Sequence, residues 1–504
     1  MRHFAYETSE VIATMSINSA LIAATSGLSA AQARIDVVSQ NVANAANPTY
    51  TRKSQELQTR IIGGQAQGVD LGVVVRTVNE GLQKDIRSQT ATVSELTVLD
   101  TYLERMVESF GRPGDDDSIS AKITDLKEKL QALSIAPELG ANQAEVLRAA
   151  ESVAAEFQEL SRTISNLRKE ADRQIADTVN LANTALENID TLNDSIATRK
   201  TQGLTTADLE DSRDQFVEEL SQYMNINVIE RSNGELTILT GDSRLLLDDT
   251  MFPLTFVETS LFTATTAGQP LQLEDGLPGT ATNPDISAEV SGKDGELAGL
   301  LRVRDTILVE AQDQLDTLAH ELANDLDTFT INGTTAVVNL FVDGGGAVPA
   351  DALGSEQGFA EVIQVNALVT GTPSILVTGD TGNGANTYVA IGSGDHRVAN
   401  AMLDVFQDTQ TFVAGFGLTA NNSIEGFAAE LVGFQANQHA TFESQLTFET
   451  NFRDTLIQTY RDESGVNTDE ELAKLIELEA AFAASARVLQ TVQQSLDELV
   501  NIIR

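Results

Sequence analysis

The chain has 504 residues, which is room for roughly three or four domains. Its 74 acidic and 32 basic residues give a net charge of −42. Nucleic acid and anionic membranes are therefore poor partners, because binding to phosphate needs a basic face. The absence of cysteine excludes disulfides, thiolate catalysis and thiolate metal sites.

The N-terminal stretch reads MRHFAYETSEVIAT. Glu7 and Glu10 interrupt it, so it lacks the apolar core of a signal peptide. No apolar run in the chain approaches the ~20 residues that a membrane span needs. A helical pattern begins only at Met15. We therefore expect Met15 to be the biological start and residues 1–14 to be a non-native or disordered extension.

From Met15 onward, apolar residues recur every seven positions in two interleaved series, the pattern of a coiled-coil strand. The series are Ile17, Ala24, Ala31 and Val38, and Leu21, Leu28, Ile35 and Val42. The pair Asn47-Pro48 is expected to end this helix, because the residue before a proline is pushed out of the α region.

The last 30 residues repeat the pattern, and only Ser485 breaks the apolar series. The series are Leu475, Phe482, Leu489, Leu496 and Ile503, and Leu478, Ser485, Val492 and Leu499. Thr468 and Glu471 predict a capping box at the start of this helix. The small residues of AFAASARVLQTV (481–492) would let a partner helix approach closely.

The two patterned ends are predicted to pair with each other. One apolar stripe alone usually lies on a globular core, but spacing of 3.5 residues at both ends favours mutual supercoiling. Residues 15–46 also carry only two charges, Arg34 and Asp36. A helix so poor in charge is normally surrounded by protein on several sides, so we expect further neighbours from other subunits. The predicted assembly interface is Ile17, Leu21, Leu28, Ile35, Val38, Val42, Leu475, Leu478, Phe482, Leu489, Val492, Leu496, Leu499 and Ile503.

Between the ends, the periodicity changes several times. Residues 50–80 suggest strands, and residues 81–225 are helical with breaks at Gly111–Gly114 and Pro137. The later segments are expected to be β-rich at 226–292, helical at 296–329, strands and loops at 335–395, and helical again at 396–460. These segments predict a mainly α fold with inserted β-rich modules. The chain folds back on itself, so that the N- and C-terminal helices pair as a coiled coil.

The same pattern suggests a division into domains. Residues 15–60 with 466–504 would form a terminal helical assembly domain. The other expected parts are a helical core domain of 61–225, 296–334 and 396–465, and a β-rich, outward-facing variable region of 226–295 and 335–395.

No motif for catalysis, metal binding or cofactor binding stands above chance. The histidines are far apart and lack metal-ligand spacing; they are His3, His320, His396 and His439. Asp115-Asp116-Asp117 lacks the alternating spacing and closing Glu of a calcium loop, so it is better explained as acids before a helix N-terminus. Gly344–Gly346 and the GNG around Asn383 lack the context of a phosphate loop and indicate turns.

Two terminal stretches resemble a known family. Asn41-Val42-Ala43-Asn44, followed by Pro48, Tyr50, Thr51 and Arg52, resembles the N-terminal signature NIANANTPGYTRQ of bacterial flagellar axial proteins. Asn47 stands for the usual Thr and Thr49 for the usual Gly. SGVNTDEE (464–471) and FAASARVLQTV (482–492) are similar to the family's SGVNLDEE and YQASARVISTV, with Thr468 in place of Leu.

The segment FGRPGDDDSISAKITDLKEKLQALSIAPE (110–138) is similar to one peculiar to the hook-associated protein 1 family. The resemblance implies a secreted, extracellular, non-enzymatic subunit without cofactor, which joins the flagellar hook to the filament. It also implies four partners: hook protein, the next junction protein, identical copies in a ring, and an export chaperone at the C-terminal helix. No nucleic acid or membrane partner is expected.

Two alternatives remain open from the residues. The chain could be another axial protein, such as flagellin or hook protein, although the long helical block 81–225 argues against hook protein. It could also be a secreted enzyme hosted in residues 226–395, where we find no catalytic motif.

Overall fold

The fold was analysed in a computed structural model that describes residues 2–62, 65–274, 283–350, 356–382, 384–412 and 417–503. The chain forms two compact units. The first unit comprises Met1–Thr90, Ala182–Phe252 and Asn451–Arg504, and the second comprises Ala91–Leu181 and Pro253–Thr450. The expected division into three kinds of domain stays a prediction. No helix among the described residues is both long and apolar enough to cross a membrane.

The first unit contains both ends of the chain. Its elements are α1 (Arg2–Ala43), β1 (Lys53–Ile62), β2 (Gln65–Arg76), the start of α2 (Glu80–Phe110), the end of α4 (Gly140–Thr201), α5 (Ala207–Tyr223), β3 (Ile226–Glu230), β4 (Leu236–Thr240), β5 (Leu245–Leu247), the end of α13 (Ile424–Ser464) and α14 (Thr468–Ile503). Strands β3, β4 and β5 form an antiparallel sheet in that order.

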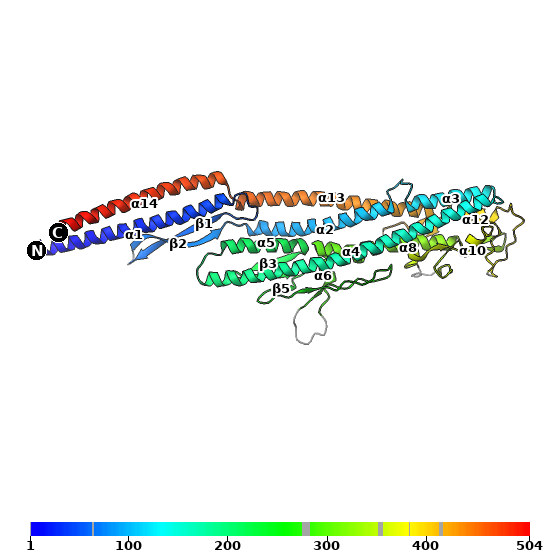
Figure 1. The fold of residues 1–504 in the computed structure, drawn as a ribbon, viewed down its shortest axis with the longest axis horizontal. Helices are drawn as coiled ribbons and strands as arrows, with labels where there is room; N and C mark the ends of the chain where they lie inside the picture. Colours follow the sequence, from blue (N-terminus) through cyan, green and yellow to red (C-terminus); the bar gives the residue numbers. More distant parts are fainter. Residues whose placement is uncertain are drawn as a thin grey trace. The chain divides into compact units, whose positions relative to one another are not determined.

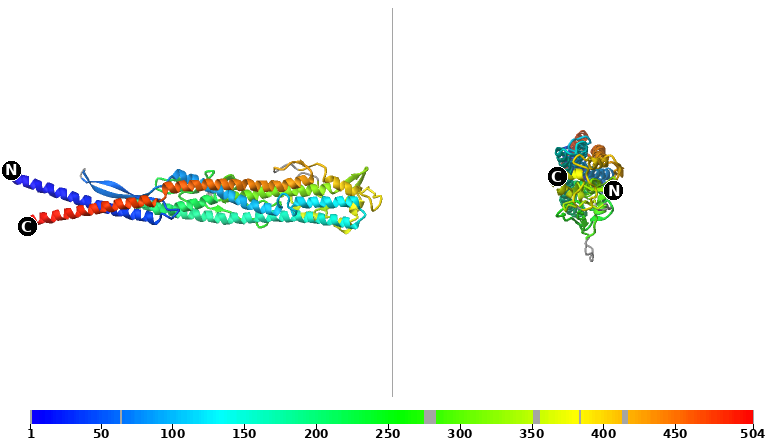
Figure 2. Two further views of the ribbon diagram at one scale, coloured as in Figure 1. Left: turned by 90° about the horizontal axis from the view of Figure 1, so that it is seen from above. Right: turned by 90° about the vertical axis from the view of Figure 1, so that its right-hand side faces the viewer.

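The terminal helices α1 and α14 lie side by side, with the two chain ends at the same end of the pair (Figures 1 and 2). This confirms the predicted fold class, mainly α with paired terminal helices. Helix α1 begins at Arg2, earlier than the expected Met15, and it ends at Ala43, before the expected stop at Asn47. Backbone turns replace the helix there, since the amide of Asn47 donates to the carbonyl of Asn44 at 2.9 Å.

Strands β1 and β2 form a two-stranded antiparallel hairpin that follows α1. Register shifts occur between Gln55 and Leu57 and between Thr59 and Ile61, as in β-bulges. At the open end of the hairpin, Lys53 pairs with Arg76. This pairing places two cations side by side at the base of the terminal helix pair.

The second unit is a helical body with short hairpins. Its elements are the rest of α2, α4 and α13, together with α3 (Ile119–Ile135), β6 (Leu254–Thr255), β7 (Gln272–Leu273), α6 (Ser287–Ser291), α7 (Glu296–Arg302), the π-helix η1 (Val303–Ile307), α8 (Leu308–Asp325), β8 (Thr328–Ile331), β9 (Thr334–Val337), β10 (Phe341–Val342), α9 (Phe359–Val362), β11 (Gln364–Val365), α10 (Ala367–Gly371), α11 (Ile375–Thr378), α12 (Arg397–Val405), β12 (Gln410–Thr411) and β13 (Asn421–Asn422). Aliphatic residues of α3, α4 and α8 form much of its core.

Several segment predictions agree with these bounds. The break at Pro137 is real, since α3 ends at Ile135 and α4 begins at Gly140. Ser118 caps α3 by accepting from the amide of Ala121 at 3.2 Å. Gly344–Gly346 form a turn, in which the amide of Gly346 donates to the carbonyl of Asp343 at 2.9 Å. Asn383 lies outside the described residues.

Two segment predictions were wrong. Residues 396–460 do not form one helix, because α12 ends at Val405 and the β12–β13 hairpin precedes α13. Gly417, in the left-handed region with φ of 82°, lies in that hairpin and favours a turn over a helix. Residues 335–395 contain three short helices, α9, α10 and α11, beside the expected strands and loops.

Candidate assembly interface

The paired terminal helices are antiparallel, and two contacts fix how they are matched. A Cβ added to Gly27 would lie 3.4 Å from the Oγ of Ser485. The side-chain amide of Asn41 donates to the Oε2 of Glu471 at 2.9 Å. Residues 27 and 41 are 14 apart, as are residues 471 and 485, so the contacts are two heptads apart on both helices. Small side chains at Gly27 and Ser485 let the helices come close.

The described seam residues follow the predicted pattern of burial to different degrees. Val38 and Leu478 are buried, and Leu496 is 36% exposed. The others are half-buried, namely Ile17, Leu21, Leu28, Ile35, Val42, Leu475, Phe482, Leu489 and Val492. The side chains of Leu499 and Ile503 lie outside the described residues. The seam thus pairs α1 with α14, and its use in assembly between subunits stays a prediction.

Helix α14 leaves other apolar side chains uncovered. Leu472 is 47%, Ile476 68% and Val488 48% exposed. Leu472 and Ile476 are one turn apart on the helix, and exposed apolar side chains that lie together commonly mark a contact with another protein. The sequence pattern had singled out the seam, whereas these residues lie outside both of its heptad series.

The β1–β2 hairpin gives α1 a second neighbour within the same chain. The amide of Val69 donates to the Oγ of Ser26 at 3.2 Å. Gly68 has φ of 102°, and a Cβ there would lie 2.2 Å from the Oγ of Ser26, so only glycine fits this approach. The low charge of α1 is therefore explained in part by its own hairpin. The sequence interpretation had assigned all further neighbours to other subunits.

Asn41 is the central residue of a buried polar cluster, located where α1 ends and α14 begins. Besides Glu471, its amide donates to the carbonyl of Lys53 at 2.9 Å, and its Oδ1 accepts from the amide of Lys53 at 3.0 Å. The hydroxyl of Tyr50 also donates to that Oδ1 at 2.9 Å. Burial, with Asp208 nearby, raises the pKa of Tyr50 to about 12, so the hydroxyl keeps its proton. One asparagine thus joins α1, β1 and α14.

The predicted capping box at Thr468 was wrong. Asn467 caps α14 instead, because its Oδ1 accepts from the amide of Asp469 at 3.0 Å. Glu471 is 1% exposed and bonds to Asn41 and Lys474 rather than turning back to the helix start. The backbone amide of Arg52 donates to the carbonyl of Ser464 at 2.9 Å, which ties the two signature stretches together directly.

An ionic cluster holds the hairpin base on α5. The side chain of Arg76, 12% exposed, bonds to Glu210 at 2.9 Å, Asp211 at 2.9 Å and Asp214 at 2.8 Å. Lys53, 4% exposed, pairs with Asp211 at 3.0 Å and with Asp208. Burial opposes the charge on Arg76, but Asp214 and Asp211 outweigh it, so the pKa of Arg76 is raised. The cross-strand pair of cations therefore meets one acidic face of α5.

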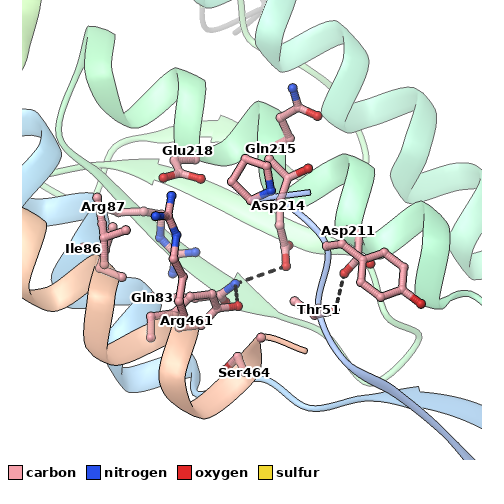
Figure 3. Close-up of a pocket in the computed structure, with 16 residues that line it drawn as sticks. Thr51, Gln83, Ile86, Arg87, Asp211, Asp214, Gln215, Glu218, Arg461 and Ser464 are labelled. Atoms are coloured by element: carbon pink, nitrogen blue, oxygen red, sulfur yellow. Dashed lines mark hydrogen bonds between the residues drawn. The ribbon is translucent and has the colours of Figure 1, made fainter. Parts of the chain in front are cut away.

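Beside this cluster is a cavity of about 180 Å³, lined by both polar and apolar groups, between residues 48–51, α2, α5 and the end of α13 (Figure 3). Gln83 donates to the hydroxyl of Tyr460 at 2.9 Å and to Asp214 at 3.4 Å. The head groups of Arg87, Arg461 and Glu218 gather at one side of it (Figure 3). Burial raises the pKa of Glu218, and the charge of Arg87 reduces this rise without cancelling it. We regard the cavity as part of the polar junction that holds the terminal pair.

No metal site was predicted from the sequence. Within the part of the chain that the structure describes, no three His, Asp or Glu side chains gather closely enough to hold a metal ion.

Comparison with known proteins matches three segments. Residues 103–340 match the family model of the flagellar hook-associated protein FlgK helical domain. Residues 457–502 match the C-terminal model of the flagellar basal body rod FlgEFG proteins, and residues 21–49 match the flagella basal body rod protein model. The two terminal matches fall on α1 and on α13–α14, the segments that meet around Asn41 and Glu471.

Two relatives that match nearly the whole chain have the same name. Flagellar hook-associated protein 1 of Escherichia coli strain K12 is 25% identical, covering 95% of this chain and 98% of that protein. The Bacillus subtilis strain 168 protein of the same name is 24% identical, over 94% and 96%. The flagellar hook junction protein FlgK from Burkholderia pseudomallei has a similar fold, with a TM-score of 0.58 and 14% identity over 75% of this chain and 99% of that one.

The paired terminal helices are similar to the terminal segments of flagellar rod proteins. Between these segments, residues 103–340 match the helical domain of one particular flagellar protein, FlgK. Over nearly its whole length the chain is similar to flagellar hook-associated protein 1.

Proposed function

We propose that this chain is a structural subunit of the bacterial flagellum that joins the hook to the filament. The observation that carries the proposal is the meeting of its two signature stretches in one buried cluster around Asn41 and Glu471. The match to hook-associated protein 1 over 95% of the chain supports it. The cluster anchors the terminal helix pair to the hairpin and to α5, so the pair acts as a preformed element for assembly.

Assembly would proceed through surfaces that the terminal pair leaves open. The exposed apolar residues Leu472, Ile476 and Val488 on α14 provide area for neighbouring subunits. The partners are identical copies in a ring, hook protein on one side and the next junction protein on the other. An export chaperone covers the C-terminal helix before secretion, and the subunit then works outside the cell.

The role is structural rather than enzymatic, in keeping with the family. The match of residues 103–340 to a hook-associated helical domain favours this role over that of flagellin or hook protein. It also leaves less room for the alternative of an enzyme hosted in residues 226–395, because it covers much of that region.

Deletion of the gene tests the proposal. Cells should keep their hooks, lose their filaments and release filament subunit into the medium, and the intact gene should restore filaments. Filaments of normal number on cells without the gene would overturn the proposal.

A further inference from the structure

The cavity of about 180 Å³ in the first unit contains charged groups that the polar junction beside it does not use. A single water needs only about 10–15 Å³, so this space can hold a group of several heavy atoms. Arg87 of α2, Glu218 of α5 and Arg461 of α13 are among its lining residues. Figure 3 shows the head groups of these three residues at one side of the cavity.

The other two carboxylates that line the cavity already have partners. Asp211 accepts from the hydroxyl of Thr51 at 2.6 Å and from Arg76 at 2.9 Å. Asp214 accepts from Arg76 at 2.8 Å and from the side-chain amide of Gln83 at 3.4 Å. Both carboxylates are therefore engaged at the base of the hairpin, and neither forms an ion pair with the arginines of the cavity.

Those two arginines are unpaired. Among the described residues, neither the guanidinium of Arg87 nor that of Arg461 has a hydrogen-bond or ion-pair partner. This is unexpected in a chain with 74 acidic and 32 basic residues. Burial lowers the pKa of Arg87, and the attraction of Asp214 and Glu218 offsets this only in part. A charged group withdrawn from water without a partner is unfavourable, so Arg87 lacks an anion.

Glu218 alone does not supply the missing negative charge. Its carboxylate also makes no ion pair within the part of the chain that the structure describes. Two unpaired cations and one unpaired carboxylate therefore face the same side of the cavity. The surplus is one positive charge, and a singly charged anion would balance it.

The geometry of the arginine side chain indicates which anion fits. A guanidinium is planar and forms two parallel hydrogen bonds to the two oxygens of a carboxylate. Chloride has the right charge but lacks these two oxygens. Doubly charged phosphate or sulfate would exceed the surplus and would be repelled by Glu218 and Asp214.

We propose that this cavity is a binding site for a carboxylate group, which Arg87 and Arg461 hold. Two sources can supply the same chemistry in the cell: a small free acid, or an Asp or Glu side chain of a neighbouring chain in the flagellum. The site itself does not depend on the proposed function.

Acetate is the probe for the first test. Isotope-labelled acetate is titrated into the purified full-length chain, and the broadening of its NMR signal gives the dissociation constant. Chloride at the same ionic strength is the reference. Arg87→Met keeps the apolar stem, removes the charge and leaves no protein group without a partner. It should raise the dissociation constant about tenfold, as expected for the loss of a charge-assisted contact.

A second variant should change binding in the opposite direction. Glu218→Gln removes the unpaired negative charge at nearly constant size, so acetate should bind more tightly than to the parent. Arg112→Met is the matched control, because Arg112 is also exposed and unpaired among the described residues but lies outside the cavity. It should leave the dissociation constant unchanged.

Three results would overturn the proposal: no broadening with the parent chain, equal binding by Arg87→Met, or weaker binding by Glu218→Gln. None of them would affect the proposed function, because deletion of the gene does not test this cavity.

The source of the carboxylate is found with cells that produce Arg87→Met. If the exported variant is folded but cells lose their filaments, a neighbouring chain supplies the carboxylate. If filaments are normal and the purified variant binds acetate weakly, the ligand is a small free acid. Both results support a carboxylate site.

Discussion

Asn41 and Glu471, separated by 430 positions in sequence, share a hydrogen bond of 2.9 Å inside the protein. Asn41 is fully buried and Glu471 is 1% exposed. A hydrogen bond to a buried carboxylate is stronger than one between neutral groups, and losing it leaves the carboxylate short of a partner. This contact is where the first and last helices of the chain are joined.

Asn41→Ala should therefore destabilise the first unit. The substitution removes the partners of Glu471, of Tyr50 and of the backbone of Lys53, at a cost of about 2–4 kcal/mol. Chymotrypsin should then cleave the purified protein faster at Tyr50, and urea should unfold it at lower concentration. Asn44→Ala is the control, since the side chain of Asn44 donates to the backbone carbonyl of Gln40, four residues earlier in the chain. Equal cleavage of both variants would show that Asn41 does not hold the base of the pair.

Leu489→Asp should block assembly while leaving the folded body intact. Leu489 is half-buried in the seam, where a carboxylate without a partner costs several kcal/mol. The main thermal transition of the purified monomer should match that of the parent, and electron microscopy should show hooks without filaments. Export is checked by the presence of the chain in the medium. Leu489→Met keeps the seam apolar and should assemble. Full motility of Leu489→Asp would refute the seam as an assembly device.

Arg76→Met tests the ionic cluster on α5. The change leaves Glu210, Asp211 and Asp214 close together without their shared cation, and breaking such a buried network costs about 3–5 kcal/mol. Arg60→Met is the control, because Arg60 is 46% exposed and lies 3.7 Å from Asp70. Its loss should cost less than about 1 kcal/mol. The free energy of unfolding in urea measures both. A small effect of Arg76→Met would mean that the hairpin base is held mainly by Asn41.

Asp316→Asn tests a buried carboxyl in the second unit. Asp316 accepts from the amides of Gly358 at 2.7 Å and Ala360 at 2.8 Å, yet burial raises its pKa from 3.8 to about 7. The folded state then binds the proton more tightly than the unfolded state. This contribution to stability is complete below pH 3.8 and is lost as the pH rises toward 7.

The variant has no such titration. Because the parent loses this stability and the variant does not, the free energy of unfolding of the variant relative to that of the parent should rise by about 2–4 kcal/mol between pH 4 and pH 7. Urea unfolding at several pH values measures the difference. A difference that is constant with pH would mean that the two backbone amides keep Asp316 ionised throughout this range.

The sequence predicted the terminal pairing well, because a heptad pattern is a local property of each helix. It also predicted the helical block 81–225, where strong periodicity and the break at Pro137 coincide with α2 to α5. The continuous helix predicted for residues 396–460 conflicts with a signal in the sequence itself. Asn421 and Asn422 with Gly417 form a turn signal inside the expected helix, and turn residues of this kind outweigh the flanking periodicity.

The polar contacts could not be predicted in the same way. Glu471, three residues after Thr468, satisfies the local rule for a capping box. The rule takes no account of Asn41, which lies 430 positions from Glu471 and binds its carboxylate. Likewise Lys53 and Arg76 are unremarkable in sequence, and only the hairpin register places them together against α5.

The Asn41–Glu471 contact also prevents the terminal helices from sliding along each other. The apolar seam repeats every seven residues, so a shift of α1 along α14 by one heptad, about 10 Å, would again bring apolar residues together. Such a shift would bury Asn41 and Glu471 apart from each other, each without its partner. The polar pair therefore favours a single register of α1 against α14. It sets how far each chain end extends, and with it the length that every subunit contributes to the assembled structure.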